Sequence, residues 1–279
     1  MIKPFKDLNL NSSFLFAAAL SDPDTCRIVL EIIFGRKISK VNVKSENSIM
    51  LSSDARCVRL DINARDEFNV NYDIEAQNSD EGNIVKRSRY YQAEMDVAEL
   101  KPGDDFQKLP DSYVIFICTF DPFKRGLYRY TFVEKCEEDG EPLGDGTCKI
   151  FFNTKGTNAD DVPEELIHFL KYFEDSTDKY VSTVEDRSIR ELHRKISELK
   201  KSREWEDGYM KMEELLERTK QKGIGQGQQM AILSILADKG ELSEDLREKI
   251  NNEEDVIQLD SWVKLAANVR SVEEFKENM

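Results

Sequence analysis

Two segments in which apolar and polar residues alternate strictly constrain the fold of this chain more than any other feature. The apolar positions are Val58, Leu60, Ile62 and Ala64 in residues 57–65, and Val70, Tyr72, Ile74 and Ala76 in residues 69–77. An alternation of period two on both sides of a short polar stretch is typical of a β-hairpin with one buried face. We therefore predict a hairpin whose other face carries the polar residues of both strands.

The register of this hairpin follows from the same pattern. Apolar residues must oppose apolar residues, so the numbers of two paired residues sum to an even value. A three-residue loop at residues 67–69 makes that sum 136, which places Asp61 opposite Glu75 and Arg59 opposite Gln77. Cross-strand partners lie about 5 Å apart at their Cβ atoms. The pattern thus predicts two carboxylates side by side on one sheet face, with Gln77 two residues further along it.

Two opposed carboxylates are costly unless a proton or a cation neutralises them. Mg²⁺ prefers a few carboxylate oxygens together with water, and the carbonyl of Ala76, next to Glu75, is a further candidate ligand. A bound Mg²⁺ suits phosphodiester hydrolysis, because it lowers the pKa of a bound water and stabilises charge on a phosphoryl oxygen. The alternative is that Asp61 and Glu75 line a hydrated sheet face and that Arg59 and Arg65 balance their charge.

The rest of the pattern up to about residue 175 predicts further helices and strands. Helical periodicity over residues 12–34 is interrupted at Asp22-Pro23 and ends at Gly35, and a strand follows near residues 38–43. Further expected elements are a helix at residues 84–100, a strand buried on both faces at 111–120, strands near 128–134 and 148–153, and a helix near 163–173. We expect an α/β domain over residues 1–180.

The remaining residues are predicted to be helical. Residues 181–222 form mainly one long charged helix, starting near residue 184, whose apolar stripe is offset at residues 203–206. Residues 223–229 have the composition of a flexible Gly/Gln linker, and residues 230–279 fit a small helical module whose last helix is capped by Ser271. Because a long helix cannot bury its stripe alone, we expect it to mediate self-association or partner choice.

Charge and composition limit the function. The formal net charge is −15, from 40 basic and 55 acidic residues, which disfavours a passive nucleic-acid binder but not an enzyme with a local basic patch and a bound cation. No apolar run approaches the ~18 residues of a membrane span, and no secretory signal is evident. The five scattered cysteines are typical of reduced thiols in a cytoplasmic protein. The two isolated histidines make zinc hydrolysis unexpected.

The densest local basic cluster is Lys86-Arg87-Ser88-Arg89, followed by Tyr90, on the predicted helix at residues 84–100. Basic side chains beside an aromatic ring suit contact with nucleic-acid phosphates and stacking on bases. The alternative is a solvated helix face whose tyrosines cover the sheet.

Several of these stretches together resemble one protein family. They are Arg59-Leu60-Asp61-Ile62, Asp73-Ile74-Glu75-Ala76-Gln77-Asn78, Lys86–Gln92, Ser112–Phe123, Gly144–Thr147 and Phe152–Gly156. In combination they closely resemble the PD-(D/E)XK nuclease-family transposases, which are also called Rpn-type recombination-promoting nucleases. The resemblance covers roughly residues 1–175, and the charged helix downstream is also similar to that of the family.

The resemblance implies a restriction-endonuclease-like αβββαβ core, with a mixed sheet flanked by helices, and Mg²⁺- or Mn²⁺-dependent cutting of DNA. Asp61 matches the metal-binding aspartate of the family and Glu75 its second acid. Gln77 stands where the wider superfamily often has a lysine, and Glu31 is a candidate for the acid on an N-terminal helix. Since Gln77 carries no charge to orient a water molecule, Arg59 or Lys86 is the candidate to supply it.

The sequence also departs from the family pattern. Ser12-Ser13 stand where acids usually precede the first helix, Ala76 replaces a usual methionine, and the repetitive tail is shortened to residues 223–229. Two functions are therefore expected from the sequence. The first is a metal-dependent DNA endonuclease linked to transposition, recombination or defence. The second is a catalytically weakened nuclease fold that binds DNA or a protein.

Overall fold

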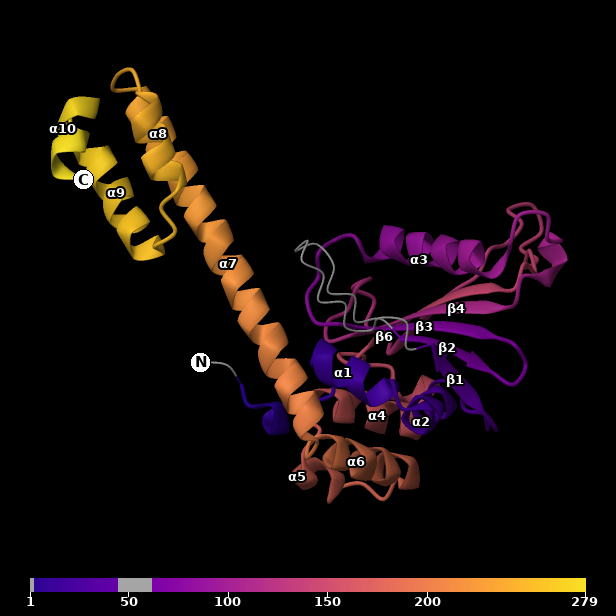
Figure 1. The fold of residues 1–279 in the computed structure, drawn as a ribbon. Helices are drawn as coiled ribbons and strands as arrows, with labels where there is room; N and C mark the ends of the chain where they lie inside the picture. The colour runs from indigo at the N-terminus through magenta and orange to yellow at the C-terminus, as the bar shows by residue number, and fades with distance from the viewer. Residues whose placement is uncertain (1–2, 45–61) are drawn as a thin grey trace. The chain divides into compact units, whose positions relative to one another are not determined.

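The structure is a computed structural model that describes residues 3–44 and 62–279 (Figure 1). The chain divides into two compact units, residues 1–209 and residues 210–279. The first unit is a mixed sheet flanked by helices, and the second is entirely helical in its secondary structure. The predicted α/β class with a helical tail is therefore confirmed.

The sheet of the first unit combines parallel and antiparallel pairs. Its described strands are β1 (Val41–Lys44), β2 (Ile62–Asp66), β3 (Asn71–Gln77), β4 (Ser112–Cys118), β5 (Arg129–Phe132) and β6 (Thr147–Asn153), in the order β1-β2-β3-β4-β6-β5. The pairs β1/β2, β2/β3 and β5/β6 are antiparallel, whereas β3/β4 and β4/β6 are parallel. The carboxyl ends of β3, β4 and β6 therefore lie at the same edge of the sheet.

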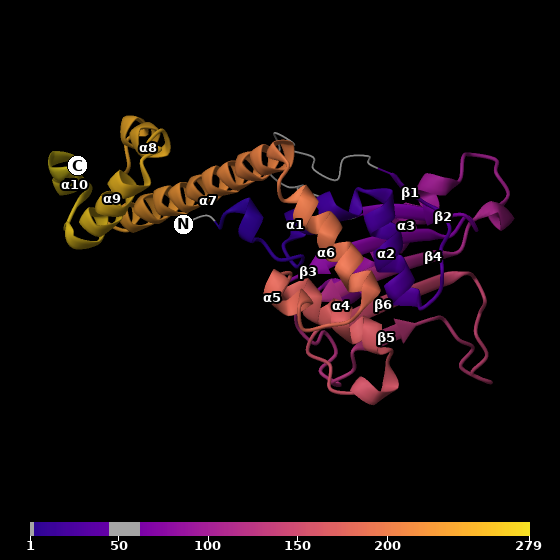
Figure 2. The same cartoon turned by 90° about the horizontal axis from the view of Figure 1, so that it is seen from below.

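Helices cover both faces of this sheet. The described helices of the first unit are α1 (Ser13–Leu20), α2 (Pro23–Phe34), α3 (Ile84–Glu99), α4 (Glu164–Glu174), α5 (Asp178–Val181), α6 (Arg187–Leu199) and the start of α7 (Arg203–Ala237), with short 3₁₀ turns at Phe5–Asp7, Phe106–Lys108 and Ala159–Asp161. In Figure 1, α3 lies above the sheet, and α1, α2 and α4 lie below it. Figure 2 shows the lower face, with α1, α2, α4 and α6 in front of the strands. The order α2, β1, β2, β3, α3, β4 is the expected αβββαβ core.

Local signals in the sequence explain the break between α1 and α2 and the end of α2. Asp22 accepts a hydrogen bond from the Thr25 backbone N–H at 2.9 Å, and Pro23 occupies the first position of α2, which needs no backbone N–H donor. Gly35 ends α2 with a left-handed φ of 62°, a conformation that costs glycine little. The predicted break and stop are both confirmed.

Apolar side chains fill the space between α3 and the sheet. The buried members of this cluster are Ile84, Val114, Phe116, Cys118, Tyr130 and Phe151. The rings of Phe116 and Phe151 stack with their centroids 5.4 Å apart. Burial of each such large side chain stabilises the fold by about 1.5–3 kcal/mol, so this cluster fixes the position of α3 over β4.

The hairpin of β2 and β3 has the predicted register. Ile62 lies opposite Ile74 and Ala64 opposite Tyr72, so the paired numbers sum to 136. Its loop is residues 67–69, in which Asn69 adopts the left-handed φ of 65° that is common at the end of a three-residue loop. These four apolar residues are buried, as predicted. Residues 57–61 lie outside the described part of the chain.

Ion pairs fasten α3 to the polar face of this hairpin near both ends of the helix. Arg87, in the first half of α3, contacts Glu75 of β3. Glu99, the last residue of α3, contacts Arg65 of β2. The polar face is therefore covered by a helix instead of lying open to water, and Arg65 balances Glu99 there.

The prediction of one long helix over residues 184–222 is wrong. Helix α6 ends at Leu199 and α7 begins at Arg203. The chain turns where the apolar stripe is offset in the sequence, because a straight helix cannot keep both parts of that stripe on one face. The buried stripe of α6 is Ile189, Leu192 and Ile196.

The prediction of a flexible linker at residues 223–229 is also wrong, because this segment lies inside α7. A glycine costs a helix about 1 kcal/mol relative to alanine, and contacts within the second unit offset this cost. Gln229 donates from Nε2 to the carbonyls of Asn251 at 3.0 Å and Glu253 at 2.8 Å. A Cβ atom at Gly225 would lie 3.5 Å from Leu259 Cδ1.

The second unit packs the end of α7 against α8 (Glu244–Asn251), α9 (Val256–Asn268) and α10 (Val272–Asn278). The buried core is Ile232, Leu236, Leu242, Leu246, Ile250, Leu259, Trp262, Ala266, Val269, Val272 and Phe275. Ser271 caps α10 by accepting a hydrogen bond from the Glu274 N–H at 3.2 Å, as the sequence predicts. Over the described ranges, no helix has the length and apolar character needed to cross a membrane.

Candidate active site

Two predicted site residues, Glu75 and Gln77, lie near the carboxyl end of β3. Both side chains contact Arg87 of α3, so both project from the face of the sheet that α3 covers. The Glu75 side chain is 18% exposed, and Gln77 is buried. Ligands of α/β sheets bind outside the carboxyl ends of the strands, so these residues lie at the expected edge.

Hydrogen bonds to both the nitrogen and the oxygen of the Gln77 side-chain amide fix its orientation. Its Nε2 donates a hydrogen bond to the Ser79 carbonyl at 2.6 Å, and its Oε1 accepts one from Arg87 Nη2 at 2.8 Å. The same Nη2 atom contacts Glu75 Oε1. Two side-chain oxygens from alternate positions of β3 therefore converge on one cationic nitrogen.

The guanidinium of Arg87 lies in partly aromatic surroundings. Its Cζ atom is 5.4 Å from the ring centroid of Phe116 and 5.7 Å from that of Tyr91, within the range of cation–π attraction. Glu81 Oε2 is 3.8 Å from Nη1. Burial alone would lower the pKa of Arg87, but the charge and hydrogen bond of Glu75, together with the charges of Tyr91 and Glu81, raise it overall, so Arg87 is a permanent cation in this site.

The neighbouring thiol has no part in the chemistry of this site. Cys118 lies opposite Gln77 in the β3/β4 pair and is fully buried. Burial, followed by the charge of Glu75, raises the pKa of the Cys118 thiol to about 12. Because the thiolate is the reactive form, a thiol of this pKa is inert near neutral pH.

The donor atoms suit a hard divalent cation. Glu75 and Gln77 offer a carboxylate and an amide oxygen, the ligand types that Mg²⁺ prefers, and these oxygens already converge on a positive charge. The Gln77 carbonyl accepts from Thr119 N on the β4 side, so the carbonyl of Ala76, one residue earlier, points toward the β2 side. Among the described residues no three His, Cys, Asp or Glu side chains are grouped to hold a metal ion. Asp61, the second predicted carboxylate, lies outside them.

The predicted basic cluster on α3 divides into two faces. Lys86, Arg89 and Tyr90 are exposed, and Tyr90 has 60% of its surface accessible. Arg87 points to the sheet and pairs with Glu75, so its prediction as a surface phosphate contact does not match its position. Arg59, the other predicted DNA contact, lies outside the described residues.

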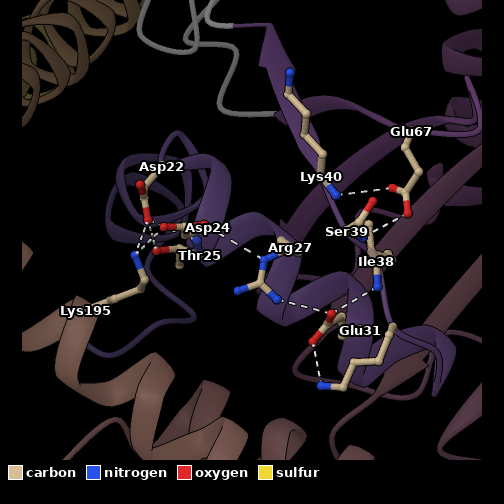
Figure 3. A network of polar contacts seen from close by, with 11 residues as sticks. Asp22, Asp24, Thr25, Arg27, Glu31, Ile38, Ser39, Lys40, Glu67 and Lys195 are labelled. Atoms are coloured by element: carbon tan, nitrogen blue, oxygen red, sulfur yellow. Dashed lines mark hydrogen bonds and ion pairs between the residues drawn. The ribbon is translucent and has the colours of Figure 1, made fainter.

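Glu31, the candidate helix acid, lies in a different network (Figure 3). Its carboxylate pairs with Arg27 at 3.1 Å and with Lys37 at 3.0 Å, and it accepts a hydrogen bond from the Ile38 N–H at 3.0 Å. These partners belong to α2 and to the connection between α2 and β1. Through these contacts Glu31 holds the connection between α2 and β1 against α2. Its role as a helix acid of the catalytic centre remains a prediction.

Sequence reasoning missed the pairing of Arg87 with Glu75, although a signal for it exists. The buried or half-buried positions of α3 follow a helical period through Ile84, Arg87, Ser88, Tyr91 and Met95. That period places Arg87 on the inner face, one residue away from the exposed Lys86. The burial of Asp73, which is 2% exposed, was also missed, because its alternation with apolar residues predicts an exposed position.

A mixed sheet with an αβββαβ core, and with acid and amide side chains near the carboxyl end of an inner strand, is consistent with a PD-(D/E)XK-type nuclease domain. The sequence model of the PD-(D/E)XK nuclease family transposases matches residues 27–220. The chain therefore belongs to this family, which supports a function of the nuclease or transposase type. Searches of curated proteins and of solved structures found no match.

Proposed function

We propose that the protein is a divalent-metal-dependent DNA endonuclease in which Asp61, Glu75 and Gln77 form the catalytic centre. The observation that carries the proposal is the convergence of the Glu75 and Gln77 oxygens on one cationic nitrogen, in a chain of a nuclease family. The alternation in the sequence that predicts the observed pairing of Ile62 with Ile74 also predicts Asp61 as the carboxylate opposite Glu75.

In this proposal Asp61, Glu75 and the Ala76 carbonyl hold Mg²⁺ or Mn²⁺. The bound cation would stabilise the charge that develops on the phosphoryl oxygens and promote ionisation of the attacking water. The amide of Gln77, fixed by its bond to the Ser79 carbonyl, presents its oxygen to that centre. Gln77 thereby orients the reacting groups without adding charge.

The exposed face of α3 is the proposed DNA contact. Lys86 and Arg89 are exposed and can neutralise phosphates, and Tyr90 offers a ring for stacking. A local basic face is what a chain of net charge −15 needs in order to approach DNA. Arg59 is proposed as a further contact on the basis of its place in the sequence.

The family supports a role in transposition or recombination, and we propose that role, or defence against foreign DNA, in the cytoplasm. Four described cysteines are free thiols, and Cys26, Cys118 and Cys148 among them are buried. Buried free thiols agree with a reducing compartment.

The test is cleavage of supercoiled plasmid in the presence of Mg²⁺ or Mn²⁺. We expect the parent protein to nick or linearise the plasmid and EDTA to stop the reaction. Asp61→Ala and Glu75→Gln should each lower the rate at least about a hundredfold, because loss of a metal ligand should cost more than the roughly 10–100-fold that follows loss of a residue that only orients a ligand. Glu165→Gln, which removes an exposed carboxylate from α4, is the matched control and should cut like the parent. Cleavage that survives both site substitutions would contradict the proposal.

A second function, a DNA- or protein-binding module without cleavage, is favoured by one observation. Arg87 pairs with Glu75, so this carboxylate has a counter-ion without a metal ion. Plasmid that is bound in a gel-shift assay but left uncut by the parent protein with either metal ion would support this second function.

Self-association through the long helix α7 of the C-terminal part of the chain is also part of the proposal. Ile232 and Leu236 are buried within the second unit, whereas Met210, Leu216 and Met230 of α7 are exposed. Light scattering on the purified protein tests whether it forms an oligomer, and a dimer would suit cutting of both DNA strands.

A further inference from the structure

We propose that Arg87 is a built-in counter-ion that occupies the metal position of the site and that a divalent cation must displace before it can bind Glu75. This inference rests on the proposed function, because it concerns the same site. It assigns to Arg87 a positioning role that its place in a basic sequence cluster does not suggest.

The first argument is the geometry of the contact. A single atom, Nη2, contacts Glu75 Oε1 and lies 2.8 Å from Gln77 Oε1. These are two of the oxygens proposed to face a metal ion. The guanidinium therefore holds the pair together in the position that a cation would take.

The second argument is charge. Two cations within about 4 Å of each other repel by about 4 kcal/mol per pair of unit charges at an effective dielectric constant of about 20. The Arg87 and Glu75 side chains are only 21% and 18% exposed, so water screens this repulsion weakly. A divalent ion and the guanidinium therefore exclude each other at Glu75 Oε1.

The third argument is that the guanidinium has an alternative partner. Glu81 Oε2 is already 3.8 Å from Nη1, and the Glu81 side chain is exposed. A rotation of the Arg87 side chain toward Glu81 would free Nη2 from Glu75 and keep the guanidinium paired. Displacement thus costs the contact with Glu75 without leaving a buried charge unpaired.

The test is equilibrium Mn²⁺ binding to the full chain, measured from the electron paramagnetic resonance signal of free Mn²⁺. Arg87→Gln removes the competing charge, and we expect it to bind Mn²⁺ at least about tenfold more tightly than the parent protein. Arg87→Lys keeps a charge and should bind close to the parent. Arg89→Gln is the matched control: it removes the same charge from the same helix at an exposed position and should change affinity less than about twofold.

A second measurement follows Mg²⁺ binding in the unmodified protein and uses a variant only to assign one resonance. The Nε–H resonance of Arg87, assigned by its loss in Arg87→Lys, should shift when diamagnetic Mg²⁺ is added. The resonances of other arginines, such as Arg218 of the second unit, should stay in place.

The outcomes separate this inference from the proposed function. If Asp61→Ala abolishes Mn²⁺ binding but Arg87→Gln binds no more tightly than the parent, the counter-ion role is refuted and the metal site stands. Saturation with Mg²⁺ without any change at Arg87 would refute it in the same way. If neither the parent nor Arg87→Gln binds Mn²⁺, both proposals fail.

Discussion

Glu31 offers a direct test of whether this carboxylate serves catalysis or the fold. Glu31→Gln keeps an acceptor for the Ile38 N–H but removes the negative charge. A hydrogen bond to a charged group is worth about 1 kcal/mol more than a neutral one, and the pair with Arg27, one helical turn away, adds about 0.3–0.5 kcal/mol. The pair with Lys37 adds little, because the Lys37 side chain is 90% exposed. We therefore expect a loss of about 1–2 kcal/mol at pH 7.

The dependence of this loss on pH follows from the pKa of Glu31. Burial alone would raise that pKa, but the Ile38 N–H, Lys37 and Arg27 together lower it below its ordinary value. A depressed pKa means that the carboxylate stabilises the fold above the unfolded pKa of about 4.3. That contribution is lost as the pH falls through the folded pKa. The parent and Glu31→Gln should therefore become equally stable at acid pH.

The assay is urea unfolding followed by the fluorescence of Trp205, whose ring centroid lies 6.1 Å from that of Phe14 in the first unit. Replacing Trp262 by Phe in every protein removes the only other tryptophan. A loss of equal size at every pH would refute the electrostatic argument. A variant with the stability of the parent that no longer binds Mn²⁺ would place Glu31 in the metal site.

Three further predictions concern the free energy of unfolding. Gly223→Ala and Gly227→Ala should each stabilise the second unit by about 0.5–1 kcal/mol, because both lie inside α7 with open space around a new Cβ; unchanged urea midpoints would contradict a helix there. Lys239→Met should destabilise that unit by about 1–3 kcal/mol, because the Lys239 Nζ donates to three carbonyls at the end of α9. Lys264 is exposed, so the control Lys264→Met should cost less than about 0.5 kcal/mol in the same urea unfolding experiment. In the loop after β4, burial tends to raise the pKa of Asp121, but hydrogen bonds led by the one from the Gly126 N–H lower it overall. Asp121→Asn should therefore cost about 1–3 kcal/mol at pH 7 and progressively less toward acid pH, and a loss independent of pH would argue against this.

The hairpin could be predicted from the sequence because its determinants are local. Alternation fixes which side chains are buried, and the three-residue loop fixes which residues are opposite, so the pairing of Ile62 with Ile74 follows from the pattern alone. The same holds for the break before Pro23 and the end of α2 at Gly35, where the residue type itself dictates the backbone conformation.

The partner of Glu75 could not be predicted in this way. Lys86, Arg87 and Arg89 are equivalent as basic residues in the sequence, and only the rotation of α3 about its axis decides which one meets the sheet. That rotation is set by the burial of Ile84 in one cluster with Val114 and Phe151, which belong to strands distant in sequence. The helical state of residues 223–229 likewise depends on contacts, such as those of Gln229 with Asn251 and Glu253, that no local pattern contains.

The two ion pairs of α3 give this helix a preferred direction on the sheet. A helix dipole favours acidic residues at the amino end and basic residues at the carboxyl end, yet α3 has Arg87 near its start and Glu99 at its end. These two charges interact unfavourably with the dipole of α3, but they pair with Glu75 and Arg65 of the sheet. If α3 docked in the reverse sense, like charges would meet at both ends, so misdocked arrangements are penalised electrostatically while the chain folds.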